Sequence, residues 1–230
     1  RPGQYRLESV IGFGGMGAVY RAFDYSLSRR VALKVVDPEG LTEYASRFRR
    51  EATSMALIDS ENIVKVYSFG SHEHELFLAM EILDGEDLEA RIERGFSEDD
   101  LPEALQYAFG FFHGLEEAHV NGITHRDIKP SNVFLARKGT KITPKLLDFG
   151  IARVDSSEVT VLTQKNALMG TPMYMAPEQM RGAKDVGARA DQFSAGAVLF
   201  EMLTGQIPYA RVPEGATDEP NWTNVLSWRV

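Results

Sequence analysis

The chain of 230 residues contains no cysteine. Disulfide bonds and thiolate metal sites are therefore excluded, which is compatible with a reducing compartment. No apolar run reaches the roughly 18 uninterrupted residues that a membrane-spanning helix needs. Residues 1–5, with sequence RPGQY, are not followed by the apolar core of a signal peptide. We therefore expect a cytoplasmic chain without a membrane segment, and any membrane anchor would belong to another part of a longer parent protein.

An excess of positive charge is also lacking. The chain has 25 Lys and Arg against 33 Asp and Glu, a net charge of -8, so nothing in the charge balance indicates a nucleic acid partner. A hydrophobic content of 43% and a charged content of 25% are those of an ordinary globular protein. Internal repeats and low-complexity tracts are absent, and the length suits one large domain or two small lobes that share a cleft.

The polar stretch at 125–132, with sequence HRDIKPSN, is the most informative part of the chain. Asp127 can accept a proton, Lys129 adds positive charge, and Asn132 offers an amide oxygen. Asp148 follows shortly afterwards, as the first residue of a DFG tripeptide. Hard oxygen ligands such as those of Asn132 and Asp148 suit Mg²⁺. Positioning and charge neutralisation are the main requirements of phosphoryl transfer, so the two motifs predict a phosphoryl-transfer site with these two residues as metal ligands.

These motifs carry a family resemblance. Either tripeptide alone can occur in loops by chance, but H-R-D-x-K-x-x-N followed by D-F-G resembles the eukaryotic-type (Hanks-type) serine/threonine protein kinases. The motifs GFGGMG at 12–17 and GTPMYMAPEQ at 170–179 are most similar to those of bacterial signalling kinases. The resemblance implies an α+β kinase domain over 1–230. An antiparallel five-stranded sheet with one helix and the hinge would occupy 1–83, and a mainly helical lobe 84–230. It also implies ATP and Mg²⁺ as cofactors and protein substrates with serine or threonine acceptors.

A glycine-rich loop, G-x-G-x-x-G-x-V, lies between strands expected at 5–11 and 18–23. Glycines let the backbone approach a phosphate closely. Rossmann proteins share the pattern, but there it opens a helix of a βαβ unit. Here a strand rich in aromatic and β-branched residues follows, which favours a kinase-type flap over phosphates. The resemblance implies contacts to ATP from Gly12, Phe13, Gly14, Gly15, Met16, Gly17 and Val19.

A lysine on the strand expected at 31–36 completes the phosphate site. The resemblance implies that Lys34, in the tetrapeptide VALK, reaches the α- and β-phosphates of ATP. The helix expected over 42–58 offers Glu51 as the ion partner that holds this lysine in place. Glu43 is the alternative, but its place in the first turn suits the helix dipole better.

The adenine pocket is predicted from the resemblance alone. Strands expected at 63–69 and 75–82 lead into a hinge between the lobes. Met80 would guard the back of the pocket, and the backbone at Glu81 to Leu83 would bind the adenine edge. The ring itself would lie between Val19, Ala32 and Phe134.

The second lobe is expected to contain two long helices. The first starts with a capping box between Ser97 and Asp100 and stops near Gly122. His113 and His119 lie six apart on different faces, so we predict no metal site there. The second helix runs from Asp191 to Gly205. The resemblance implies that Asp191 accepts hydrogen bonds from the catalytic-loop backbone, below an apolar stack of Met55, Val66, Phe149 and His125.

The segment from Asp148 to Glu178 resembles the activation segment of the family. Thr171 would hydrogen-bond near the catalytic residues, and Arg126 would capture a phosphate on this segment. The possible phosphate acceptors are Ser156, Ser157, Thr160 and Thr163, of which we favour Thr163. A dimer of the kinase would allow autophosphorylation.

Family domains continue for about three helices beyond the position of Gly205, whereas residues 211–224 are rich in turn-forming residues. We therefore expect a second lobe that is truncated, and no partner can be assigned to Glu178. Two alternatives to an active protein kinase stay open. One is a pseudokinase that binds nucleotide or partners without turnover. The other is a small-molecule kinase of related fold. The tripeptides Gly170-Thr171-Pro172 and Ala176-Pro177-Glu178, which resemble those of a segment that binds protein substrates, disfavour this alternative.

Overall fold

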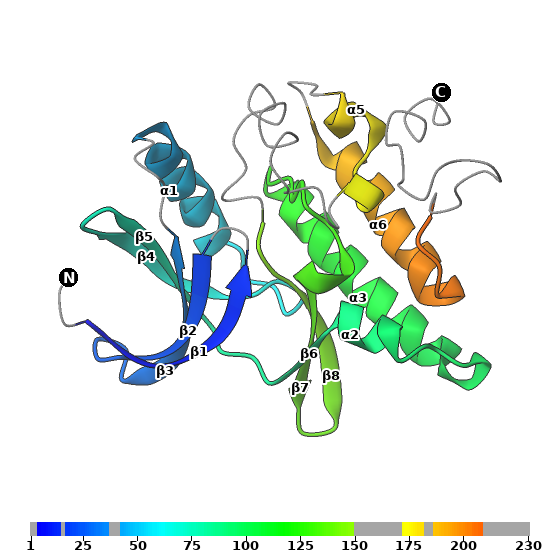
Figure 1. Cartoon of the computed structure of the whole chain (residues 1–230), viewed down its shortest axis with the longest axis horizontal. Helices are drawn as coiled ribbons and strands as arrows, with labels where there is room; N and C mark the ends of the chain where they lie inside the picture. The colour runs from blue at the N-terminus through cyan, green and yellow to red at the C-terminus, as the bar shows by residue number, and fades with distance from the viewer. Residues whose placement is uncertain (1–3, 15–16, 37–41, 150–171, 182–185, 209–230) are drawn as a thin grey trace, which may run out of the picture.

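A computed structural model describes residues 4–14, 17–36, 42–149, 172–181 and 186–208. Figure 1 shows two groups of elements: a twisted sheet with one long helix, and a mainly helical part that includes a smaller sheet. This arrangement matches the two lobes predicted from the sequence.

The larger sheet is antiparallel and has five strands in the order β1-β2-β3-β5-β4. Gly17, at the start of β2, has a φ of +146°, and a Cβ there would lie 2.0 Å from the Val35 carbonyl oxygen, so only glycine fits. The predicted five-stranded antiparallel sheet is confirmed. Its strands are β1 (Tyr5–Gly14), β2 (Gly17–Asp24), β3 (Arg29–Val36), β4 (Val66–His72) and β5 (Glu75–Met80).

One helix, α1 (Thr42–Ala56), packs against this sheet. Its buried face carries Phe48, Ala52 and Met55, which belong to the same hydrophobic cluster as Val66 of β4. The helix ends two residues before the predicted limit of 58. The strand expected from residue 63 begins only at Val66.

The second group of elements is built on α3 (Leu101–Val120) and α6 (Ala188–Thr204), which pack against one another. Residues 85–87 form a strand that pairs with β7, so the helix that follows, α2, begins only at Leu88. Asp87 then caps α2, its Oδ1 accepting from the Ala90 N–H at 2.8 Å. The remaining elements are β6 (Gly85–Asp87), α2 (Leu88–Glu93), β7 (Val133–Lys138), β8 (Lys141–Leu146) and α5 (Pro177–Met180).

The segment before β4 joins the two groups. The Asn62 side chain donates to the Pro144 carbonyl at 2.9 Å, and the Leu146 N–H donates to the Asn62 carbonyl at 2.8 Å. A Cβ on Gly114 of α3 would lie 2.6 Å from that same Asn62 carbonyl oxygen. The glycine therefore allows the segment to lie directly on α3, which fixes the sheet relative to the helical lobe.

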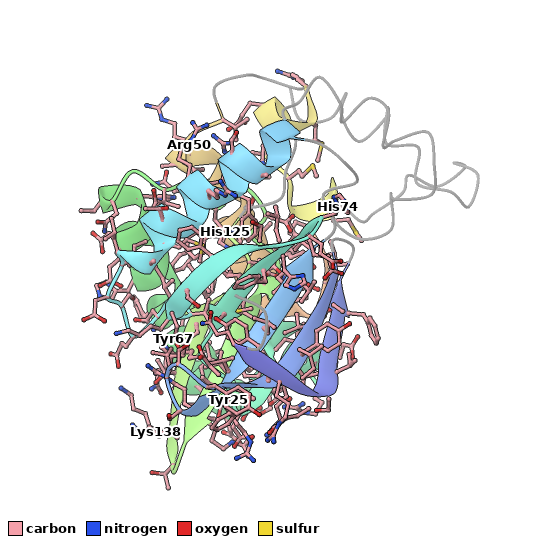
Figure 2. The ribbon with its side chains drawn as sticks, turned by 90° about the vertical axis from the view of Figure 1, so that its left-hand side faces the viewer. Tyr25, Arg50, Tyr67, His74, His125 and Lys138 are labelled. Atoms are coloured by element: carbon pink, nitrogen blue, oxygen red, sulfur yellow. The ribbon has the colours of Figure 1, made fainter. Side chains whose placement is uncertain are left out.

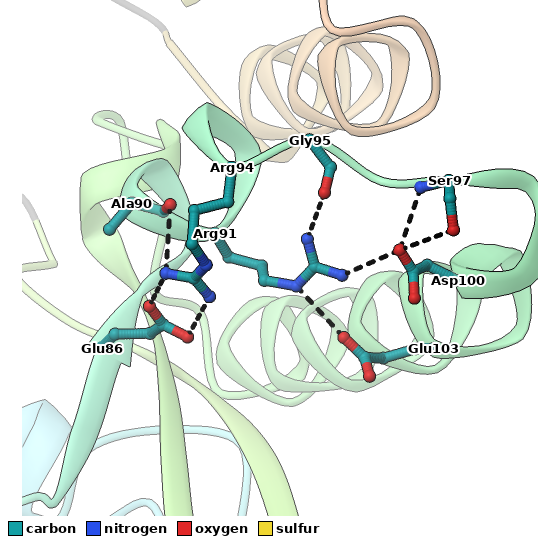
Figure 3. Close-up of polar contacts among 8 residues, drawn as sticks. All are labelled: Glu86, Ala90, Arg91, Arg94, Gly95, Ser97, Asp100 and Glu103. Carbon is teal, nitrogen blue, oxygen red and sulfur yellow. Dashed lines mark hydrogen bonds and ion pairs between the residues drawn. The ribbon is translucent and has the colours of Figure 1, made fainter.

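A polar network around Arg91 holds α2 against the start of α3 (Figure 3). The Arg91 guanidinium donates to Glu103 at 3.2 Å and to the Gly95 carbonyl, lies 3.5 Å from Asp100, and stacks on the Phe96 ring. Asp100 also accepts from the Ser97 N–H at 2.9 Å, as the predicted capping box requires. Among the residues that the structure describes, the hydrogen-bond partners of Arg94 are Glu86 and the Ala90 carbonyl.

Replacing Arg91 by alanine is expected to lower the free energy of unfolding by about 2 kcal/mol, because charge-assisted hydrogen bonds and a ring contact are lost together. Arg94→Ala is the matched control. Its side chain is 55% exposed against 12% for Arg91, so we expect a loss of at most about 0.5 kcal/mol. Urea denaturation of both variants measures the difference. Equal losses of unfolding free energy in the two variants would show that the network around Arg91 stabilises the fold no more than the exposed ion pair of Arg94 does.

Candidate active site

His125 organises the centre of the molecule, where Figure 2 shows it in the interior. Its ring packs on Phe149 with centroids 4.6 Å apart. The ring atom Nε2 lies 2.7 Å from the Leu147 carbonyl oxygen, and Nδ1 accepts from the Asp127 N–H at 3.3 Å. One buried ring therefore holds the loop of Asp127 and the loop of Asp148 together.

The protonation state of His125 follows from these contacts. Because Nε2 faces a carbonyl and Nδ1 faces an N–H, the hydrogen-bond network assigns a neutral ring with its proton on Nε2. Burial lowers the pKa of His125 and outweighs the opposing effects of Asp191, the Leu147 carbonyl, Asp127 and Asp148.

This depressed pKa predicts a pH-dependent stability. The folded ring resists protonation while the unfolded ring titrates near its usual pKa of about 6.5, so the contribution is complete above that pH and is lost as pH falls. The slope can reach about 1.4 kcal/mol per pH unit. Urea denaturation between pH 7.5 and 5.5 should show a shallower slope for His125→Phe than for the parent. His74→Phe, at an exposed position, should keep the parental slope. Parallel slopes for all three proteins would contradict the assignment.

Asp191, in the first turn of α6, anchors the loop that begins at His125. Its side chain is buried, and its two oxygens accept from the His125 N–H and the Arg126 N–H, both at 2.7 Å. His119, near the end of α3, places Nε2 2.8 Å from the same carboxylate. The two residues of this contact lie 72 positions apart along the chain. No local pattern indicated that contact.

The side chains of the loop itself form a compact cluster. Asn132 Nδ2 donates to the Asp127 carbonyl at 2.7 Å and to Asp127 Oδ2 at 3.1 Å. Lys129 Nζ lies 3.3 Å from the same Oδ2. Because the amide nitrogen of Asn132 binds Asp127, the carboxamide oxygen is the atom that suits a cation.

Lys34 of β3 and Asp148 come together from different lobes. Lys34 Nζ lies 2.7 Å from Asp148 Oδ1, and Asp148 adopts a φ of +47°, a backbone conformation that is costly for a non-glycine residue. The described residues contain no cluster of three or more His, Cys, Asp or Glu side chains around one point. An all-protein cage is therefore not formed by these residues. One carboxylate and one amide oxygen, completed by phosphate oxygens, fit Mg²⁺.

Comparison with known proteins bears on this arrangement. The sequence profile of the protein kinase domain matches residues 5–226. The chain belongs to the protein kinase family. The chain is 40% identical to a probable serine/threonine-protein kinase of Streptomyces coelicolor over 97% of its length, and 39% identical to serine/threonine-protein kinase PrkC of Bacillus subtilis over 90%. It spans about a third of the length of these relatives, 34% and 31% respectively.

A solved structure gives the same result for the fold. The kinase domain of Mycobacterium tuberculosis PknI superimposes with a TM-score of 0.73 at 29% sequence identity, covering 90% of this chain and 77% of that one. The two-lobed kinase fold predicted from the sequence is confirmed. Among the described helices, none is both long enough and apolar enough to cross a membrane.

Glu81, in the segment predicted to form the hinge, makes contacts on both sides of that segment. Its N–H donates to the Lys65 carbonyl at 2.9 Å, and its carboxylate accepts from the Lys65 N–H at 2.8 Å and from Lys145 Nζ at 2.7 Å. Lys145 belongs to β8, so Glu81 is bonded to both groups of elements. Nothing in the sequence pattern indicated the contact between Glu81 and Lys145, whose positions are 64 apart.

The residues predicted to hold adenine differ in exposure. Met80 and Ala32 are buried and face one another in the register of β3 and β5. Val19, Leu83 and Phe134 are partly buried, whereas Phe13 is 84% exposed at the end of β1. The adenine contacts of the other residues stay predictions, as does the contact of Phe13 with ATP.

For the other predicted site residues, the structure gives either the element that carries the residue or no description at all. Glu51 lies on α1 and Glu178 on α5, both partly buried. The ion pair of Glu51 with Lys34 stays a prediction. Several positions lie outside the described residues: Gly15, Met16, Gly150, Ser156, Ser157, Thr160, Thr163 and Thr171.

Proposed function

We propose that this kinase domain transfers the γ-phosphoryl group of ATP to serine or threonine hydroxyls of protein substrates. The observation that carries the proposal is the pair of loops held by His125. One loop presents Asp127, Lys129 and Asn132 in a hydrogen-bonded cluster, and the other presents Asp148 to Lys34. The relatives of known name are serine/threonine-protein kinases, which supports this substrate class.

In the proposed reaction Asp127 orients the acceptor hydroxyl and takes its proton. The hydroxyl oxygen forms a bond to the γ-phosphorus while the bond between that phosphorus and the bridging oxygen of ADP breaks. Lys129, 3.3 Å from the Asp127 carboxylate, is placed to stabilise negative charge on the transferred group. The Asn132 amide holds the carboxylate of Asp127 in a fixed direction.

The nucleotide would bind between the lobes. Lys34 would exchange its contact with Asp148 for the α- and β-phosphates, with Glu51 as its proposed support. Mg²⁺ held by Asn132 and Asp148 would neutralise phosphate charge. The hinge from Glu81 to Leu83 would bind adenine, and Asp191 would hold the loop in register without taking part in the chemistry.

Transfer of radiolabelled phosphate from γ-³²P-ATP tests the proposal. The purified protein should label serine and threonine peptides and leave a matched tyrosine peptide unlabelled. Titration with a fluorescent ADP analogue in the presence of Mg²⁺ measures binding separately. Nucleotide binding without any transfer would contradict the proposal and favour a pseudokinase, and labelling of the tyrosine peptide alone would contradict the substrate class.

A further inference from the structure

Gln179, the third residue of α5, connects two segments that lie far apart in the sequence. Its Oε1 accepts from the Ala176 N–H at 3.1 Å, at the start of the same helix. Its Nε2 donates to the Arg126 carbonyl oxygen at 2.9 Å. The two contacts fix the orientation of the amide, because a flipped amide would place its NH₂ against an N–H and its oxygen against a carbonyl.

The carbonyl that Gln179 contacts belongs to a strained part of the catalytic loop. Arg126 has a φ of +64°, in the left-handed region that costs a non-glycine residue about 1–2 kcal/mol. Its N–H is held by Asp191 at 2.7 Å, and its carbonyl by Gln179. The next N–H, that of Asp127, is held by His125. These three contacts therefore restrain the backbone from which the Asp127 side chain projects.

The segment that carries Gln179 is itself attached to the lobe. The Tyr174 hydroxyl donates to Glu201 of α6 at 2.6 Å. Burial raises the pKa of Tyr174, so the hydroxyl keeps its proton and stays a donor. Residues 174–179 thus connect α6 to the catalytic loop. Because Tyr174 fixes this segment to α6, Gln179 can hold the Arg126 carbonyl in a defined position relative to that helix.

We propose that Gln179 is a positioning residue for the phosphoryl transfer: its side-chain N–H holds the peptide between Arg126 and Asp127, and so directs the Asp127 carboxylate at the acceptor hydroxyl. The inference rests on the proposed function. Gln179 would act through the backbone of the loop and would not touch ATP or the acceptor.

Two substitutions separate this role from a purely structural one. Gln179→Glu keeps an oxygen that can accept from Ala176 but replaces the donor to Arg126 by a second oxygen. Gln179→Ala removes both contacts. A misplacement of about 1 Å at a catalytic group can cost a factor of about 100 in rate, so we expect kcat for a serine peptide to fall at least about tenfold in both variants. For Gln179→Glu, the KM for ATP and the affinity for ADP should stay within about twofold of the parental values. Its thermal unfolding midpoint should stay within a few degrees of that of the parent. Gln106→Glu, on an exposed position of α3, is the matched charge control.

The outcomes are distinct. If Gln179→Glu keeps the parental kcat while Gln179→Ala is impaired, the residue only caps α5 and the inference is overturned. Equal loss of kcat and nucleotide affinity in Gln179→Glu would also overturn it, because that indicates general disruption of the site. A parent protein that binds nucleotide but transfers no phosphate would refute the proposed function itself, which the measurement on the unsubstituted chain reveals first.

Discussion

Replacing Asp127 by asparagine is expected to lower kcat for peptide phosphorylation by about 100- to 10,000-fold, the usual contribution of a general base. Asparagine keeps the shape of the side chain, and its carbonyl oxygen can still accept from Asn132 Nδ2. What is lost is the negative charge beside Lys129 and the capacity to take a proton. The chemistry should therefore fail while the loop keeps its form.

Measuring nucleotide binding beside turnover distinguishes these effects. Asp127 contacts Asn132, Lys129 and His125. Because its proposed role is to bind the acceptor hydroxyl and not the nucleotide, the affinity of Asp127→Asn for ADP should change by less than about threefold. Asp99→Asn removes the same charge at an exposed position and should keep parental kcat. Residual turnover above a tenth of the parental value would show that another group accepts the proton.

Asp191→Ala is expected to impair both stability and turnover. The change leaves the N–H groups of His125 and Arg126 without the acceptor that they now share, and His119 loses its partner as well. Each buried donor left unsatisfied costs about 1–3 kcal/mol, so the free energy of unfolding should fall by about 3 kcal/mol. Because the strained turn at Arg126 loses its support, kcat should fall at least about 100-fold in the fraction that remains folded.

Ser194→Ala provides the control for Asp191. Ser194 is buried on the same helix, and its hydroxyl bonds only the Ala190 carbonyl one turn earlier. Its removal should cost less than about 1 kcal/mol and leave kcat unchanged. Denaturant unfolding and steady-state kinetics of the two variants give the comparison. An Asp191→Ala protein with parental stability and turnover would show that the loop is held by other contacts.

Much of the fold could be predicted because its signals are local. Alternation of apolar residues and the glycine-rich turn indicate strands over short windows, and β1 to β3 lie where the sequence placed them. The strand at 85–87 could not be predicted, since it depends on pairing with Ala136, Leu135 and Phe134, which lie about 50 positions further along the chain. Residues 63–64 read as strand from their β-branched side chains, yet they pair with Leu146 and not with β5.

The candidate site divides in the same way. Motif spacing predicted that Asp127, Lys129 and Asn132 belong to one site, and the structure brings these side chains together, while their roles in catalysis stay predictions. The spacing carried no information on the groups that hold the loops in place, because the partners come from other elements. His119, Gln179 and Lys145 make their contacts 72, 53 and 64 positions away. Such pairings depend on how helices and sheets pack, and a single sequence does not record them.

The contacts of the Glu81 carboxylate also bear on how fast a bound nucleotide can dissociate. Its Oε1 accepts from the Lys65 N–H and also pairs with the partly buried ammonium of Lys145. A motion that separates the two lobes must lengthen at least one of these two contacts of Glu81, the residue that is expected to bind adenine. Dissociation of ADP should therefore require the ion pair between Glu81 and Lys145 to separate. Because salt screens such a pair, the dissociation rate of ADP should depend on ionic strength.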